Sequence, residues 1–214
     1  MPTASSWGRH DVSAKILGTY ERHVTDRLVG CANPNGVLLD LGSADGYFAV
    51  GALRAGLFSR AICFERSQKG RAALRAAATQ NGVAERIEIK GDATEAAILA
   101  AVPKDAVGVA LCDIEGGEFH VLTDAVLQHL ATLHVIIELH DFLVEDGAAK
   151  KAALIDRAAT HFTTEIMVTG ATPISEFPEL DRFDDDRRLL AFSEGREAAT
   201  DWLVLHPKPS RSPA

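Results

Sequence analysis

Five short apolar runs alternate with helical segments through the middle of the chain, and this order constrains the fold more than any other feature. Continuous apolar runs are typical of strands buried on both faces, which belong to parallel sheets with helices on either side. We therefore predict an α/β domain with right-handed crossovers. The predicted strands are 37–41, 61–64, 86–90, 107–112 and 133–139, and the predicted helices are 47–55, 68–80, 94–101 and 118–130.

The flanking segments carry simpler patterns. Residues 11–29 place apolar side chains four apart, which predicts one amphipathic helix. This helix could pack on the sheet edge, act as a lid or form a homodimer contact. The chain after the main pattern is predicted to contain a helix at 147–159, strands at 164–169 and 201–206, and a short helix at 184–193 that begins with acidic residues.

These patterns divide the chain into three predicted parts. Residues 1–35 form an N-terminal helical extension, residues 36–206 form the main domain, and residues 207–214 form a disordered, proline-rich tail. The segment 170–200 is an insertion between the last two predicted strands. Connections of this length in compact domains are usually functional or partly disordered.

Composition limits the classes of partner. The chain has 214 residues, which suits one domain, and its net charge of −8 disfavours affinity for nucleic-acid phosphates. No run of 18 apolar residues or secretory signal is present, so we expect no membrane partner. Two of the three cysteines lie in apolar runs, which favours reduced, buried thiols and a cytoplasmic location.

A glycine turn follows the first predicted strand of the main domain. It begins at Asp40 and contains Gly42 and Gly46, with Ala44 where a dinucleotide-binding turn would have its middle glycine. Asp40 and Asp45 would repel a pyrophosphate, but they suit a ligand with positive charge. S-adenosylmethionine (SAM) carries an ammonium and a sulfonium group and no phosphate, so the turn favours SAM over NAD.

The next two strands also end in acidic residues. Glu65 follows the second strand, where an acid accepts hydrogen bonds from ribose hydroxyls, and Asp92 follows the third, where an acid can accept from an adenine amino group. Open α/β sheets bind ligands at the carboxyl ends of their strands. The predicted cofactor-binding residues are Asp40, Gly42, Ser43, Gly46, Glu65, Arg66, Asp92, Ala93 and Asp113.

With these residues in place, the chain from Gly36 to Phe142 resembles the class I SAM-dependent methyltransferases. Residues 112–118 (Cys-Asp-Ile-Glu-Gly-Gly-Glu) and 137–140 (Ile-Glu-Leu-His) resemble the motifs of the FkbM-type methyltransferase family. That family commonly has a lysine where this chain has Leu111. The resemblance implies a Rossmann-like, doubly wound sheet of seven strands, mostly parallel with an antiparallel last strand.

Candidate catalytic residues follow the fourth and fifth strands. We assign Asp113, Glu138 and His140 to catalysis, with His140 as a general base for a hydroxyl nucleophile. Glu115 and Glu118 follow Asp113, and Glu118 is expected to cap a helix. Oxygen ligands with one nitrogen would also suit Mg²⁺ or Mn²⁺. The candidate metal ligands are Asp113, Glu138, His140 and Asp141.

The sequence thus favours a SAM-dependent methyltransferase that transfers a methyl group to the hydroxyl of a small molecule or sugar. No Asn-Pro-Pro-Tyr or Asp-Pro-Pro-Tyr motif, which suits amino groups on bases or glutamine amides, follows the fourth strand. Two alternatives stay open: an NAD-dependent oxidoreductase and a non-catalytic SAM-binding module.

Overall fold

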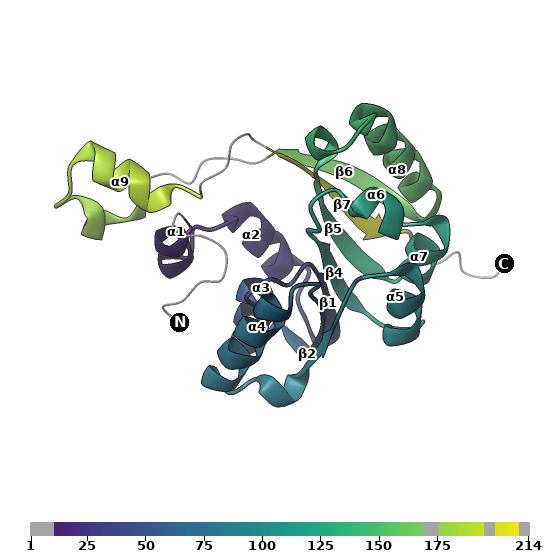
Figure 1. Ribbon diagram of the computed structural model, residues 1–214, viewed down its shortest axis with the longest axis horizontal. Helices are drawn as coiled ribbons and strands as arrows, with labels where there is room; N and C mark the ends of the chain where they lie inside the picture. The colour runs from purple at the N-terminus through teal and green to yellow at the C-terminus, as the bar shows by residue number, and fades with distance from the viewer. Residues whose placement is uncertain (1–10, 169–175, 195–199, 210–214) are drawn as a thin grey trace.

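A computed structural model describes residues 11–168, 176–194 and 200–209. Seven strands of these residues form one sheet in the order β3-β2-β1-β4-β5-β7-β6 (Figure 1). The strands are β1 (Asn33–Leu41), β2 (Phe58–Phe64), β3 (Ile87–Lys90), β4 (Gly108–Cys112), β5 (Leu133–Leu139), β6 (Phe162–Val168) and β7 (Asp201–Pro207). Strands β1 to β5 are parallel, and β7 is antiparallel to both of its neighbours. The predicted seven-stranded α/β sheet with an antiparallel last strand is confirmed.

Helices cover both faces of the sheet (Figure 1). One face carries α2 (Arg22–Gly30), α3 (Tyr47–Arg54) and α4 (Gln68–Gln80), and the other carries α5 (Glu95–Ala101), α7 (Asp124–His129) and α8 (Gly147–His161). Alternate residues of β1 face opposite cores: Leu38 packs with the first set of helices and Leu39 with the second. Both cores consist of aliphatic side chains with a few aromatic ones. The central strands are buried on both faces, so their sequences are continuous apolar runs.

The predicted helix over residues 11–29 is wrong in one respect, because the structure has two helices, α1 (Val12–Leu17) and α2. Gly18 ends α1 in the left-handed region, at φ 74°, and Glu21 precedes α2 at φ 45°. Two left-handed residues so close together cannot continue a helix. The chain therefore turns sharply between them.

The predicted helix over residues 118–130 is likewise divided, into α6 (Glu118–Val121) and α7. Leu122 leaves helical geometry at ψ 65°, and the Thr123 side chain accepts a hydrogen bond from the amide of Val126. This cap begins a new helix. The short helix predicted at 184–193 is confirmed as α9 (Asp185–Phe192), with Asp184 as its side-chain cap.

Other predicted boundaries differ by a few residues. Strand β1 begins at Asn33, before a register irregularity that ends at Val37, and the strand predicted at 164–169 is β6, which begins at Phe162. Residues 170–175 and 195–199 of the predicted insertion, residues 1–10 of the predicted extension and residues 210–214 of the predicted tail lie outside the described residues. Cys63 and Cys112 are buried and free, as expected. No helix in the described part of the chain is both long and apolar enough to cross a lipid bilayer.

Sheet register aligns the carboxyl ends of the parallel strands. Leu41 pairs with Phe64 and Cys112, Phe64 pairs with Lys90, and Cys112 pairs with Ile137. The next residue of each strand therefore falls in one row along this edge. In sheet order these residues are Gly91, Glu65, Gly42, Asp113 and Glu138.

Candidate functional site

The glycine turn lies against the end of β4. Gly42 has φ 92°, and a Cβ built there would overlap the carbonyl oxygen of Asp113. Its amide and that of Ser43 donate to the carbonyl of Phe64, at 2.9 and 3.0 Å, and the Ser43 hydroxyl donates to the carbonyl of Asp40 at 2.7 Å. The turn is thus held to the strands on both sides, which requires glycine at position 42.

Glu65 joins the end of β2 to the same turn. One carboxylate oxygen accepts from the Ala44 amide at 3.0 Å, and the other accepts from the Ser67 amide at 2.6 Å. Gly70 leaves room for this side chain, since a Cβ there would lie 2.7 Å from the Glu65 Cγ. A carboxylate has about four acceptor positions, so Glu65 can hold the turn and still accept from a ribose.

Asp40 lies beneath the turn and is buried, with 3% of its surface exposed. Burial, reinforced by the charges of Glu65 and Asp45, raises the pKa of Asp40 to about 7. Its Oδ2 atom has no hydrogen-bond partner among the described residues. A buried carboxyl of this kind is stabilised by a ligand that brings a donor or a positive charge.

Helix α1 reaches the turn from the N-terminal side. Lys15 forms ion pairs with Asp45 at 3.2 Å and with Asp11 at 2.9 Å, and its ammonium lies 4.8 Å from the centre of the Tyr20 ring. The Tyr20 ring packs edge-on against Tyr47 at the start of α3. The N-terminal segment therefore contacts the glycine turn as well as the sheet.

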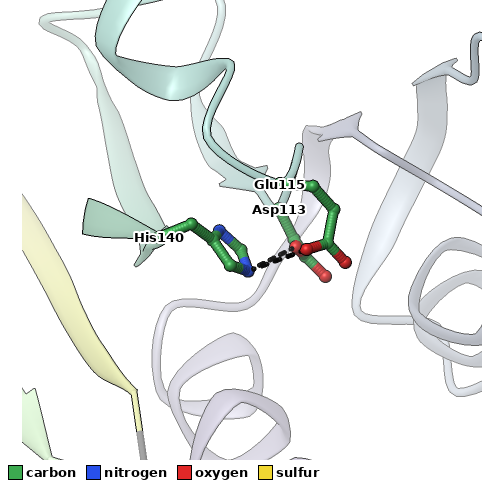
Figure 2. A group of neighbouring side chains, drawn as sticks. All are labelled: Asp113, Glu115 and His140. Atoms are coloured by element: carbon green, nitrogen blue, oxygen red, sulfur yellow. Dashed lines mark ion pairs between the residues drawn. The ribbon is translucent and has the colours of Figure 1, made fainter. Parts of the chain in front are cut away.

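His140 lies just past the end of β5 and points toward the end of β4 (Figure 2). Its Nε2 atom is 3.4 Å from a Glu115 oxygen, 3.7 Å from an Asp113 oxygen and 3.7 Å from a Glu138 oxygen. Burial alone would lower the pKa of His140, but Glu118, Glu138 and Glu115 outweigh it, and the pKa is raised. The imidazole thus lies among carboxylates that stabilise its protonated form.

Glu118 holds His140 close to the loop that follows β4. It is fully buried at the start of α6, and its carboxylate accepts from the amides of Gly116 at 2.9 Å and His140 at 2.8 Å. The Glu118 side chain therefore ties the loop after β4 to the end of β5. Glu118 begins α6 as expected, but the expected capping role is not confirmed, because no side-chain hydrogen bond caps this helix and Gly116 lies before its N-cap residue, Gly117.

Two further residues complete the cluster. The Thr200 hydroxyl donates a hydrogen bond to the Glu138 carboxylate at 2.7 Å. Glu21 of the N-terminal segment places a carboxylate oxygen near one of Asp113 and one of Glu138, and these three oxygens lie within 4.8 Å of one another. Burial, then the charges of Glu138, Glu21 and Glu115, raise the pKa of Asp113 well above its usual value. Segments from three distant parts of the sequence thus meet around Asp113.

The structure brings together only part of the predicted site. Asp113, Glu138 and His140 meet, but Asp141 turns away and lies 3.6 Å from the Nζ of Lys151. Arg66 and Asp92 are exposed at the ends of β2 and β3. In the described part of the chain, neither side chain has a hydrogen bond or ion pair with another predicted site residue. Ala93 packs against the core on the α5 side.

Glu21 and Thr200 were not predicted as site residues. Thr200 is the last residue of the insertion 170–200, and its pattern carried no signal for the site. Gly18 was a usable signal for Glu21, because a glycine within an amphipathic pattern marks a possible helix end. A helix that ends there frees the following residues to turn toward the sheet.

Comparison with known proteins supports the fold. Models of protein families and a search of curated proteins gave no match. A precorrin-6Y C5,15-methyltransferase from Geobacter metallireducens matches with a TM-score of 0.59 and 14% identity, over 87% of each chain. An rRNA methylase from Streptococcus thermophilus matches with a TM-score of 0.56 and 15% identity, over 86% of this chain and 94% of the other.

A tRNA methyltransferase from B. subtilis also matches, with a TM-score of 0.54 and 14% identity, over 87% of this chain and 64% of the other. At identities of 14 to 15%, these matches show a shared fold and nothing finer. The chain therefore has the fold of the class I SAM-dependent methyltransferases.

Proposed function

We propose that the protein is a SAM-dependent methyltransferase of the FkbM type that methylates a hydroxyl of a small molecule or sugar. The observation that carries this proposal is the shared edge of the sheet, where the glycine turn with Asp40 and Glu65 lies in line with Asp113 and Glu138. Cofactor and base would meet there in one site. The two FkbM-like motifs occupy the ends of β4 and β5, beside this turn.

The residues of the edge divide into two groups by chemistry. The glycine turn offers room for the backbone to approach a ligand, and Asp40, Asp45 and Glu65 supply negative charge and acceptors for a cationic nucleoside. We assign SAM binding to this group, with Asp92 at the adenine end. Pyrophosphate would meet the same carboxylates, which disfavours NAD.

We assign His140 as the general base that takes the proton of the acceptor hydroxyl. In the transfer, an acceptor oxygen forms a bond to the methyl carbon of SAM while the bond between that carbon and sulfur breaks. The electron pair of the broken bond stays on the sulfur, which becomes a thioether. The hydroxyl proton passes to the Nε2 of His140, and the surrounding carboxylates stabilise the imidazolium that forms. Alignment of oxygen, carbon and sulfur supplies much of the rate.

The proposal is tested by separating the two groups. Glu65→Ala leaves the amides of Ala44 and Ser67 without their partner, so SAM affinity measured by calorimetry should fall about tenfold or more. His140→Ala should leave SAM affinity nearly unchanged and lower the single-turnover rate of methyl transfer to hydroxyl acceptors by about 100-fold.

Three results would contradict the proposal. They are binding of NAD without binding of SAM, equal loss of SAM affinity in both variants, and methyl transfer to RNA in preference to small hydroxyl acceptors. Methyl transfer at the wild-type rate in His140→Ala would show that His140 is not the general base. SAM binding with no transfer to any acceptor in a cell extract would favour a binding module.

A further inference from the structure

One cavity, with a volume of about 600 Å³, lies between α2 and the strands β5, β6 and β7. Five of its lining residues carry nitrogen or sulfur donors, namely His23, Cys31, His134, Met167 and His206. The whole chain has only three cysteines, two methionines and eight histidines, so these donors are concentrated here. Imidazole, thiol and thioether are the donors that zinc and copper ions prefer in proteins.

Two of these histidines face each other across neighbouring antiparallel strands. Val135 of β5 pairs with Leu205 of β7, which places His134 opposite His206. Their Nδ1 atoms are 3.2 Å apart. Two nitrogen ligands of a tetrahedral zinc ion, each about 2.0 to 2.1 Å from the metal, lie about 3.3 Å from one another. The pair therefore already has the spacing of two ligands of a single ion.

Glu165 of β6 determines which nitrogen of His206 can act as a ligand. Its Oε2 atom lies 3.3 Å from the Nε2 of His206. An ionised carboxylate only accepts hydrogen bonds, so in the neutral ring Nε2 carries the proton and Nδ1 keeps a lone pair. That Nδ1 is the atom that faces His134. Histidines that bind metals usually donate their other ring N–H to a carboxylate in this way.

His134 is suited to the same role. Burial, then the proximity of His206, lowers the pKa of His134, so this ring is neutral near pH 7. A neutral imidazole is the form that binds a metal. Without an ion, the 3.2 Å contact is a hydrogen bond from a proton on the Nδ1 of His134. An ion between the rings would take the place of that proton, and His134 would carry its proton on Nε2 instead.

The charges around the histidine pair favour a cation. Arg27 and Asp26 of α2 line the cavity, and Glu165 adjoins it. Arg27 forms an ion pair with the Oε1 of Glu165, which offsets its positive charge. Arg22 approaches Asp26 only to 3.9 Å, from the exposed side. One positive and two negative side chains at the cavity therefore leave a local surplus of negative charge.

We propose that His134 and His206 bind a transition-metal ion of the Zn²⁺ class between β5 and β7, with Glu165 holding His206 in position as a ligand. Both histidines line the cavity, so the coordination positions that they leave open face it, on the side that carries Cys31 and Met167. The ion would join two strands of the sheet and stabilise the folded chain.

This site is separate from the candidate active site. His134 is the second residue of β5, whereas Glu138 and His140 lie at the other end of that strand. The inference therefore does not depend on the proposed methyltransferase activity, and either can fail without the other.

The test measures Zn²⁺ binding by calorimetry near neutral pH, on the full chain without SAM. Wild type should bind Zn²⁺ with a dissociation constant in the micromolar range, and His206→Gln should bind at least about tenfold more weakly. Glu165→Gln keeps the size of the side chain but removes its charge, so it should weaken binding about tenfold. His161→Gln is the matched control, because it removes a histidine that pairs with Asp124 beside α8, and it should bind like wild type.

NMR of the wild-type chain identifies the ligands without any substitution. Zn²⁺ should shift the ring resonances of His134 and His206 and leave those of His161 unchanged, while His140 reports any separate binding at the candidate active site. Zn²⁺ should also raise the unfolding temperature of wild type more than that of His206→Gln. Unfolding in EDTA shows that each variant is folded.

Three results would overturn the site. They are wild-type affinity for Zn²⁺ weaker than millimolar, equal affinity of wild type and His206→Gln, and ring shifts confined to His140.

Discussion

Gly42 is the residue at which the glycine turn and the end of β4 come closest. Alanine at this position would need a left-handed backbone at φ 92°, and its Cβ would overlap the carbonyl oxygen of Asp113. We expect Gly42→Ala to lower the free energy of unfolding by about 3 kcal/mol or more, measured by chemical denaturation. SAM affinity should fall with it, because the same turn lies at the cofactor site.

A second glycine provides the control for this change. Gly51 lies within α3, and a Cβ there would have no atom within 4 Å. Gly51→Ala should therefore raise the free energy of unfolding by up to about 1 kcal/mol, since alanine favours the helix. If the two substitutions changed the free energy of unfolding by similar amounts, the close approach at Gly42 would not contribute to stability.

His140 is the other residue whose surroundings predict a measurable property. In the protein without SAM or metal, NMR titration should give the His140 imidazole a pKa above its usual value of 6.5, because Glu118, Glu138 and Glu115 outweigh the effect of burial. Glu115 is largely exposed, so Glu115→Gln should lower that pKa by about half a unit or less. Glu145→Gln, an exposed change, is the control. A pKa below 6.5 in wild type would contradict this electrostatic account.

At the scale of elements, an ion pair links α1 to the glycine turn of the main domain. Lys15 connects it to Asp45 of the glycine turn, and its side chain is only 10% exposed. Lys15→Ala should speed amide hydrogen exchange in α1 by about tenfold while the exchange of β1 and β4 stays slow. Exposed Lys104→Ala should change neither. Unaltered exchange in α1 would show that other contacts hold this helix.

Most elements could be predicted from the sequence because their signals are local. The bounds of α4 and β5 follow from periodicity and from continuous apolar runs, and both match the predicted ranges. Two predicted helices, 11–29 and 118–130, are each divided in the structure, and a single residue marks the break in each case. Gly18 ends α1, and Thr123 begins α7 with a side-chain cap. Periodicity spans such breaks, since apolar spacing can continue on both sides.

The residues of the candidate site that lie at the ends of strands could be predicted from the sequence. Asp113 and His140 follow parallel strands and Glu138 lies near the end of one, and parallel register brings such positions to one edge. Glu21 and Thr200 reach the cluster through the packing of the N-terminal segment and through the chain before β7. Such contacts between distant segments have no local pattern. Glu65 illustrates an intermediate case, since its position was predicted but its bonds to Ala44 and Ser67 were not.

For the molecule as a whole, a net charge of −8 with acids gathered at one sheet edge predicts an unusual dependence of stability on pH. Asp40 has a pKa of about 7 in the folded protein and 3.8 as its ordinary value, so the folded state holds its proton over a range in which the unfolded state has lost it. The stabilisation from that proton is complete below pH 3.8 and is lost as the pH rises through 7. The raised pKa of Asp113 acts in the same direction.

We therefore expect the cofactor-free protein to lose stability between about pH 5.5 and about pH 8, with Asp40 contributing about 2 kcal/mol of the loss. Asp40→Asn mimics the protonated carboxyl and should remove that share, so that its unfolding free energy falls less steeply over the same interval. Chemical denaturation at the two pH values measures both slopes, and equal slopes would contradict the assignment to Asp40. A cation that binds at this edge should flatten the wild-type slope, because it favours the ionised carboxylates that burial disfavours.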